Sequence, residues 1–112
     1  MSFRTINRQI IKDGVMSSTN TIYGDILQID QGMTVAFECV FTGTPTGTLT
    51  VEGSNTGSNW NTLDIDINSP VGSAGTTGID ILRTGFRYLR LKYTNISGSG
   101  VLQAYIYAKG GI

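Results

Sequence analysis

The stretch Met33-Thr34-Val35-Ala36-Phe37-Glu38-Cys39-Val40-Phe41 decides the fold, because its side chains alternate strictly. One side carries Val35, Phe37, Cys39 and Phe41, and the other carries Thr34, Ala36, Glu38 and Val40. A period of two is typical of a β-strand with one face in a core. The connection Thr42-Gly43-Thr44-Pro45-Thr46-Gly47 contains two glycines and a proline, so it predicts a turn. We therefore expect a hairpin with the next alternating run, residues 48–54.

Similar short runs fill the chain on both sides of this stretch. Including the first one, they cover residues 22–29, 33–41, 48–54, 60–67, 79–82, 87–94 and 101–108, with Gly, Asn, Ser or Pro between them. Many short strands with regular turns predict an all-β fold. We expect an antiparallel β-sandwich of jelly-roll type with 7–8 strands, in which 87–94 and 101–108 form the last hairpin. The predicted core is Val35, Phe37, Phe41, Leu49, Val51, Trp60, Leu63, Ile65, Leu89 and Leu91.

The composition favours the same fold class. Gly, Thr, Ser and Asn make up 46 of the 112 residues, as 15, 15, 9 and 7. These residues suit strands and tight turns rather than helices. The length fits one domain with one core.

The first twenty residues lack this regularity. Phe3, Ile6 and Ile10 are spaced for one helical face, but an isolated helix of this length is marginal in water. We therefore divide the chain into an N-terminal arm, residues 1–20, and a sandwich domain, residues 21–112. The alternative is an extra edge strand around residues 9–12.

Charge is balanced in total and segregated along the chain. Residues 1–12 carry +3, residues 13–82 carry −8 and residues 83–112 carry +5, which sum to zero. A neutral total gives no reason to expect nucleic acid as a partner. The blocks either pair across strands within one sheet or orient neighbouring subunits.

The sequence offers little for catalysis or cofactors. Histidine is absent, and the only cysteine, Cys39, allows neither an intrachain disulfide nor a Cys/His metal cluster. Asp64 and Asp66 lie two apart with no supporting groups, and with Asn68 they lack the glycine and glutamate of a calcium loop. Phosphate-loop, dinucleotide and zinc motifs are missing as well. We expect a solvated acidic face, no enzyme activity and no cofactor.

No apolar stretch approaches the roughly 20 residues of a membrane span, and no secretory signal is evident at the N-terminus. We therefore expect no membrane partner and synthesis in the cytoplasm.

Two segments resemble discoidin-like domains. They are residues 49–63, with Gly53-Ser54-Asn55, Gly57 and Asn59-Trp60, and residues 86–94, with Arg87-Tyr88-Leu89-Arg90-Leu91. This resemblance implies a carbohydrate-binding module as one function. Its candidate aromatic residues are Trp60, Tyr23, Tyr88, Tyr105 and Tyr107.

Most of the segment 30–108 is similar to small virion proteins of tailed bacteriophages. The likeness rests on Phe41-Thr42-Gly43-Thr44-Pro45-Thr46-Gly47-Thr48-Leu49 and on Ser97-Gly98-Ser99-Gly100, and it does not cover the first twenty residues. It implies a structural protein of the capsid exterior, head fibre or tail, located in the virion and made in the host cytoplasm. We take this as the main functional hypothesis.

Assembly would then be the mode of action. Residues 101–108 are apolar on both sides, and the N-terminal segment carries apolar residues without an evident local core, so both predict contacts with partners. The expected partners are further copies of the chain and other virion proteins, with a glycan as a further possibility. The predicted assembly interface comprises Phe3, Arg4, Ile6, Arg8, Ile10, Ile11, Arg87, Arg90, Lys92, Tyr105 and Tyr107.

Overall fold

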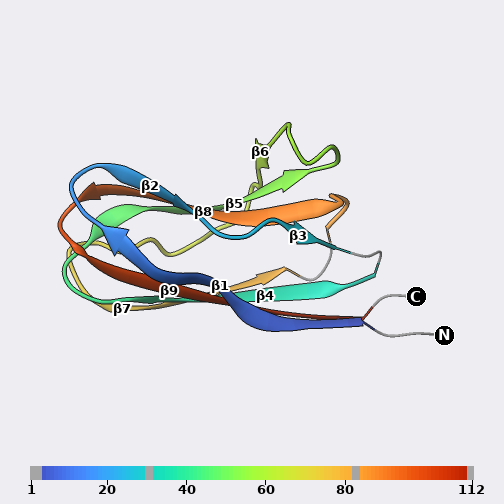
Figure 1. The fold of residues 1–112 in the computed structure, drawn as a ribbon, viewed down its shortest axis with the longest axis horizontal. Coiled ribbons are helices and arrows are strands. Elements are labelled where there is room, and N and C mark those ends of the chain that lie inside the picture. Colours follow the sequence, from blue (N-terminus) through green and yellow to red (C-terminus); the bar gives the residue numbers. More distant parts are fainter. Residues whose placement is uncertain (1–3, 30–31, 82–83, 111–112) are drawn as a thin grey trace.

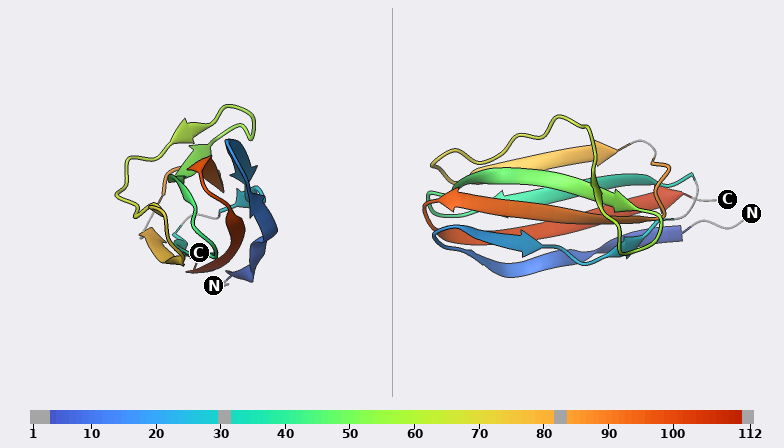
Figure 2. Two further views of the ribbon diagram at one scale, coloured as in Figure 1. Left: turned by 90° about the vertical axis from the view of Figure 1, so that its left-hand side faces the viewer. Right: turned by 90° about the horizontal axis from the view of Figure 1, so that it is seen from above.

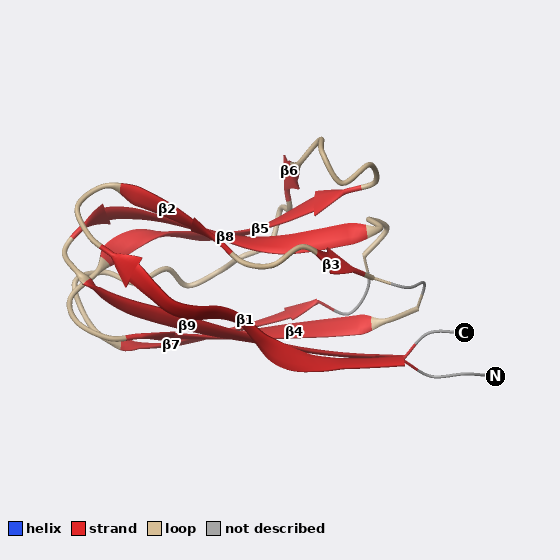
Figure 3. Cartoon of the chain, viewed as in Figure 1, coloured by secondary structure: helices blue, strands red, loops and turns tan. Residues whose placement is uncertain are grey.

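The structure is a computed structural model that describes residues 4–29, 32–81 and 84–110. Within these residues it contains strands and loops but no helix (Figure 3). The strands are β1 (Arg4–Met16), β2 (Asn20–Tyr23), β3 (Leu27–Gln28), β4 (Thr34–Phe41), β5 (Thr46–Ser54), β6 (Asn61–Thr62), β7 (Gly75–Ile81), β8 (Tyr88–Ser97) and β9 (Gly100–Gly110). No helix suited to crossing a membrane occurs in the described part.

The strands form two antiparallel sheets that face each other as two layers (Figures 1 and 2). Sheet A has the order β1-β9-β4-β7, and sheet B has the order β2-β8-β5-β6, with β3 also paired to β8. The predicted fold class, an antiparallel β-sandwich, is confirmed. The described residues contain nine strands rather than seven or eight, because β1 is a strand and the predicted run 22–29 forms two strands, β2 and β3.

The core lies between the sheets and follows the predicted alternation. The predicted core residues Val35, Phe37, Phe41, Leu49, Val51, Leu89 and Leu91 are all buried, as is Cys39. Trp60 and Ile65 were assigned to the core wrongly: Trp60 is half-buried outside the core cluster, and Ile65 is 37% exposed. Leu63 is only partly buried against the core. The predicted strand 60–67 pairs with β5 only at β6 and through the Leu63 amide, so the later alternation of its side chains does not follow a sheet.

The two predicted hairpins are wrong. Strand β4 does not pair with β5, and β8 does not pair with β9. In both cases the connection crosses from one sheet to the other. The two crossing turns lie against each other, and the Thr44 amide donates to the Ser99 carbonyl at 2.9 Å. Gly98 adopts a φ of 78°, and a Cβ there would collide with the Thr44 carbonyl. Glycine at this corner therefore permits both the left-handed backbone and the close approach.

The N-terminal segment is part of the sandwich. Strand β1 pairs with β9 along its whole length, and Ile10, Ile11 and Met16 are buried in the core. The prediction of an arm is therefore wrong for residues 4–16, and the alternative of an edge strand is correct. Irregularities between Gln9 and Ile11 and between Ile11 and Gly14 add unpaired residues to β1. Such bulges break the period of two, so the side chains of residues 4–16 do not alternate as they do in a regular strand.

Candidate functional site

Two tyrosines stand on the outer face of sheet A. Along β9, Ala104, Ile106 and Ala108 face the core, so Tyr105 and Tyr107 point to the opposite side. Their exposed fractions are 40% and 45%. Strand β9 is central in sheet A, between β1 and β4, so these rings lie in the middle of the face.

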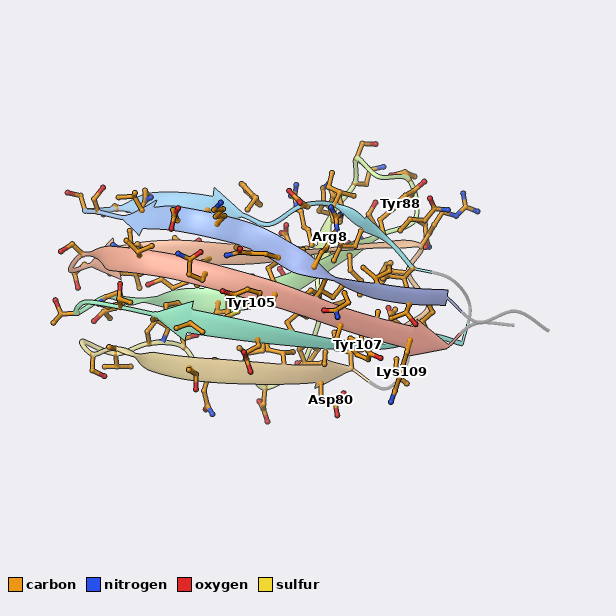
Figure 4. The ribbon with its side chains drawn as sticks, turned by 60° about the horizontal axis from the view of Figure 1, so that its bottom comes forward. Arg8, Asp80, Tyr88, Tyr105, Tyr107 and Lys109 are labelled. Atoms are coloured by element: carbon orange, nitrogen blue, oxygen red, sulfur yellow. The ribbon has the colours of Figure 1, made fainter. Side chains whose placement is uncertain are left out.

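The strand register places two rows of outward side chains next to each other. One row is Asn7, Tyr107, Ala36 and Asp80, and the other is Gln9, Tyr105, Glu38 and Gly78. Because Ala36 and Gly78 rise little above the sheet, the surface is hollow beside the tyrosine rings. The result is a groove of about 850 Å³. The outward residues that line it are Asn7, Thr34, Ala36, Glu38, Gly78, Asp80, Tyr105, Tyr107 and Lys109. Figure 4 shows Tyr105, Tyr107, Lys109 and Asp80 on this face.

Polar groups surround the rings in this groove. Glu38 and Asp80 supply carboxylates, Lys109 an ammonium group and Asn7 an amide. Within residues 4–29, 32–81 and 84–110, none of these four side chains has a hydrogen bond or ion pair to another protein group. They are therefore free to contact a ligand.

The outer face of sheet B holds a different cluster, centred on Arg90. Its Nε donates to Glu52 Oε1 at 2.8 Å, and its guanidinium lies 4.3 Å from the Tyr23 ring centre and 4.1 Å from that of Trp60. The Arg90 side chain is only 19% exposed. Trp60 thus covers an ion pair outside the sheet instead of closing the core. The sequence carried no signal for this cluster, because its members come from β2, β5, β8 and the turn before β6.

Four of the eleven predicted interface residues are engaged within the chain. Ile10 and Ile11 are buried in the chain's own core, and Arg90 is held by Glu52. Arg8 forms an exposed ion pair of 3.5 Å with Asp25. Ile10 and Ile11 therefore pack within the chain, and Arg8 and Arg90 pair with acids of the same chain.

The other predicted interface residues fall on several surfaces. Ile6 packs partly against the core. Arg87 is exposed just before β8 of sheet B, and Lys92 is half-buried on β8. Tyr105 and Tyr107, in contrast, lie on sheet A. Phe3 and the side chain of Arg4 lie outside the described residues.

Cys39 does not behave as a reactive group. Burial, with a smaller contribution from the Glu38 carboxylate, raises the pKa of the Cys39 thiol to about 12. The thiol therefore stays protonated near neutral pH, and a thiol is a poor nucleophile. Asp64 and Asp66 are exposed, and no group of three or more His, Cys, Asp or Glu in the described residues is arranged to hold a metal ion.

No protein-family model and no curated protein matches this sequence. Several solved structures are similar in fold. A chain from the structure of infectious bursal disease virus, Gx strain, matches with a TM-score of 0.64 and 15% identity, over 97% of this chain and 33% of the viral chain. The present chain thus spans about a third of that viral chain.

Two other solved structures match over most of this chain. PirA gives a TM-score of 0.53 with 18% identity, covering 86% of this chain and 91% of PirA. The CBM22-1–GH10 modules of Clostridium thermocellum xylanase 10B, complexed with xylohexaose, give 0.54 with 12% identity, over 96% of this chain and 30% of that chain. At such identities these likenesses establish the fold alone.

Proposed function

We propose that the protein is a non-enzymatic structural component of a phage-type virion and acts through protein–protein assembly. The observation that carries the proposal is the fold match over 97% of the chain to part of a protein chain from a virus structure. The sequence resemblance of residues 30–108 to phage virion proteins points the same way. In this proposal the protein is made in the host cytoplasm and becomes part of the particle.

Charge on the two sides of the sandwich supports assembly between copies. Strand β1, at one edge of sheet A, carries the exposed Arg8 and Lys12; Arg8 pairs with Asp25, and the exposed Asp13 lies on the same strand. Strand β7, at the other edge, carries the exposed Asp80. The exposed Asp64 and Asp66 belong to the neighbouring segment 63–70.

That segment closes the acidic side of the sandwich. The Leu63 amide donates to the Val51 carbonyl of β5 at 2.9 Å, and Thr77 Oγ1 of β7 donates to the Asn68 carbonyl at 2.9 Å. The end-on view in Figure 2 shows β1 and this segment on opposite sides of the molecule. An acidic side and an opposite side that carries the exposed cation Lys12 fit head-to-tail contacts between copies.

Ion-pair contacts between two copies are individually weak. An exposed ion pair contributes about 0–1 kcal/mol and weakens with salt. Side-by-side contacts of this kind are weak in isolation, and many of them act together when copies are arrayed on a particle.

Mass spectrometry of purified particles tests the location, and sedimentation velocity at low and high salt tests the contact. We expect the protein in particles and salt-sensitive self-association. Asp64→Lys/Asp66→Lys and Arg8→Glu/Lys12→Glu should each lose self-association, and a mixture of the two should regain it. The variant Arg87→Glu/Lys92→Glu changes two charges of the predicted interface at and beside β8, and association like that of the parent would exclude these two residues from the contact. Absence from particles, together with a monomer at every concentration, would refute the proposal.

A further inference from the structure

We infer that the groove on the outer face of sheet A is a binding site for a neutral oligosaccharide. This inference is independent of the location in a virion. It rests on the shape of the groove, on the two tyrosine rings and on the polar groups around them.

The size of the groove fits a small ligand. Its volume of about 850 Å³ lies within the range of roughly 300–1,000 Å³ that ligand sites occupy. The space exists because small residues lie beside large ones in both rows. Ala36 lies next to Tyr107, and Gly78 lies next to Glu38. A flat protein contact would not need this hollow, whereas a chain of sugar rings fills one.

The tyrosines supply the apolar part of the site. The C–H faces of a sugar ring pack against aromatic rings, and Tyr105 and Tyr107 are each less than half exposed, with their bases fixed in a central strand. Two residues along a strand span about 7 Å. A ligand of at least two sugar units therefore reaches both rings.

The polar groups determine the class of sugar. Glu38 and Asp80 accept hydrogen bonds from hydroxyl groups, and Lys109 and Asn7 donate them. All four lack protein partners within the described segments. With two carboxylates against one ammonium group, the groove repels anionic sugars. A neutral, hydroxyl-rich chain satisfies this set of groups.

Isothermal titration calorimetry of the full chain tests the site. The neutral test sugars are cellohexaose, maltohexaose, mannohexaose and chitohexaose, and hexagalacturonate is the acidic comparison. We expect at least one neutral hexasaccharide to bind saturably with a Kd of about 1 mM or tighter. Tyr105→Ala and Tyr107→Ala should each weaken binding at least about tenfold. Hexagalacturonate should bind more weakly than that sugar.

A groove-filling variant keeps the test independent of folding. A Cβ at Gly78 meets no atom within 4 Å, so Gly78→Val enters open space in a strand that suits a β-branched residue. We expect its melting temperature to match the parent and its sugar binding to fall at least about tenfold. Gly75→Val is the matched control: it lies on the same strand, has equally open surroundings and does not line the groove.

Three results would overturn the inference. The first is that no neutral hexasaccharide saturates up to about 10 mM. The second is sugar binding that survives Gly78→Val unchanged or that favours hexagalacturonate. The third is a change in sedimentation on Gly78→Val without any sugar binding, which would make the groove a protein contact instead.

Discussion

Replacing Arg90 should destabilise the fold strongly, although the residue lies outside the core. Its partner Glu52 is only 7% exposed, and the two are joined by a 2.8 Å hydrogen bond under the rings of Tyr23 and Trp60. Arg90→Met removes the charge and retains much of the apolar stem. The Glu52 carboxylate would then remain nearly buried without a counter-charge.

The expected loss in the free energy of unfolding is about 3–5 kcal/mol. Removing one partner of a buried ion pair costs this amount, because the remaining charge is uncompensated. The two lost ring contacts contribute about 1 kcal/mol of it at a partly exposed site. The double variant Arg90→Met/Glu52→Met removes both charges, so it should recover most of the loss.

Urea unfolding followed by far-UV circular dichroism measures these values. Circular dichroism is preferable to fluorescence, because Trp60, the only tryptophan, contacts the mutated side chain. Arg87→Met serves as the control, since Arg87 is exposed, and it should change stability by less than about 0.5 kcal/mol. A loss below about 1 kcal/mol for Arg90→Met, or a double variant that equals the sum of the single ones, would refute the reasoning.

Three further predictions concern the core and pH. Phe37→Ala should cost about 3–5 kcal/mol in urea unfolding, because Phe37 is 2% exposed between the sheets; a cost below about 1 kcal/mol would contradict this. Ile11→Ala should cost about 2–5 kcal/mol, whereas a residue in a detached arm would cost almost nothing, so the same measurement checks that β1 belongs to the fold. Burial, and secondarily Glu38, raises the pKa of Cys39 from 9.0 to about 12, so the folded protein keeps a proton that the unfolded chain releases. Stability should therefore be fully present below about pH 9 and fall above it by roughly 1 kcal/mol per pH unit, and urea midpoints from pH 8 to 10.5 should show a shallower fall for Cys39→Ala.

The fold class and the centre of the core follow from local sequence patterns. Strict alternation in residues 33–41 placed Phe37 and Cys39 inside, and the structure agrees. Alternation is a local property of the strand, since it fixes which side chains share a face. The apolar character of both sides of residues 101–108 left two outcomes open, a strand covered on both faces or one with exposed aromatic residues, and the structure shows Tyr105 and Tyr107 exposed.

Strand pairing and the form of the surfaces depend on contacts between residues far apart in the chain. The strands expected in hairpins instead cover each other across the core, and the close packing of Thr44 against Gly98 that fixes these corners joins residues far apart in the chain. Bulges placed both Ile10 and Ile11 inward, although a regular strand would turn one of them out. The groove depends on Ala36 and Gly78 lying in adjacent rows on neighbouring strands. Register between strands sets all of these features, and register follows from the packing of the whole domain rather than from any local pattern.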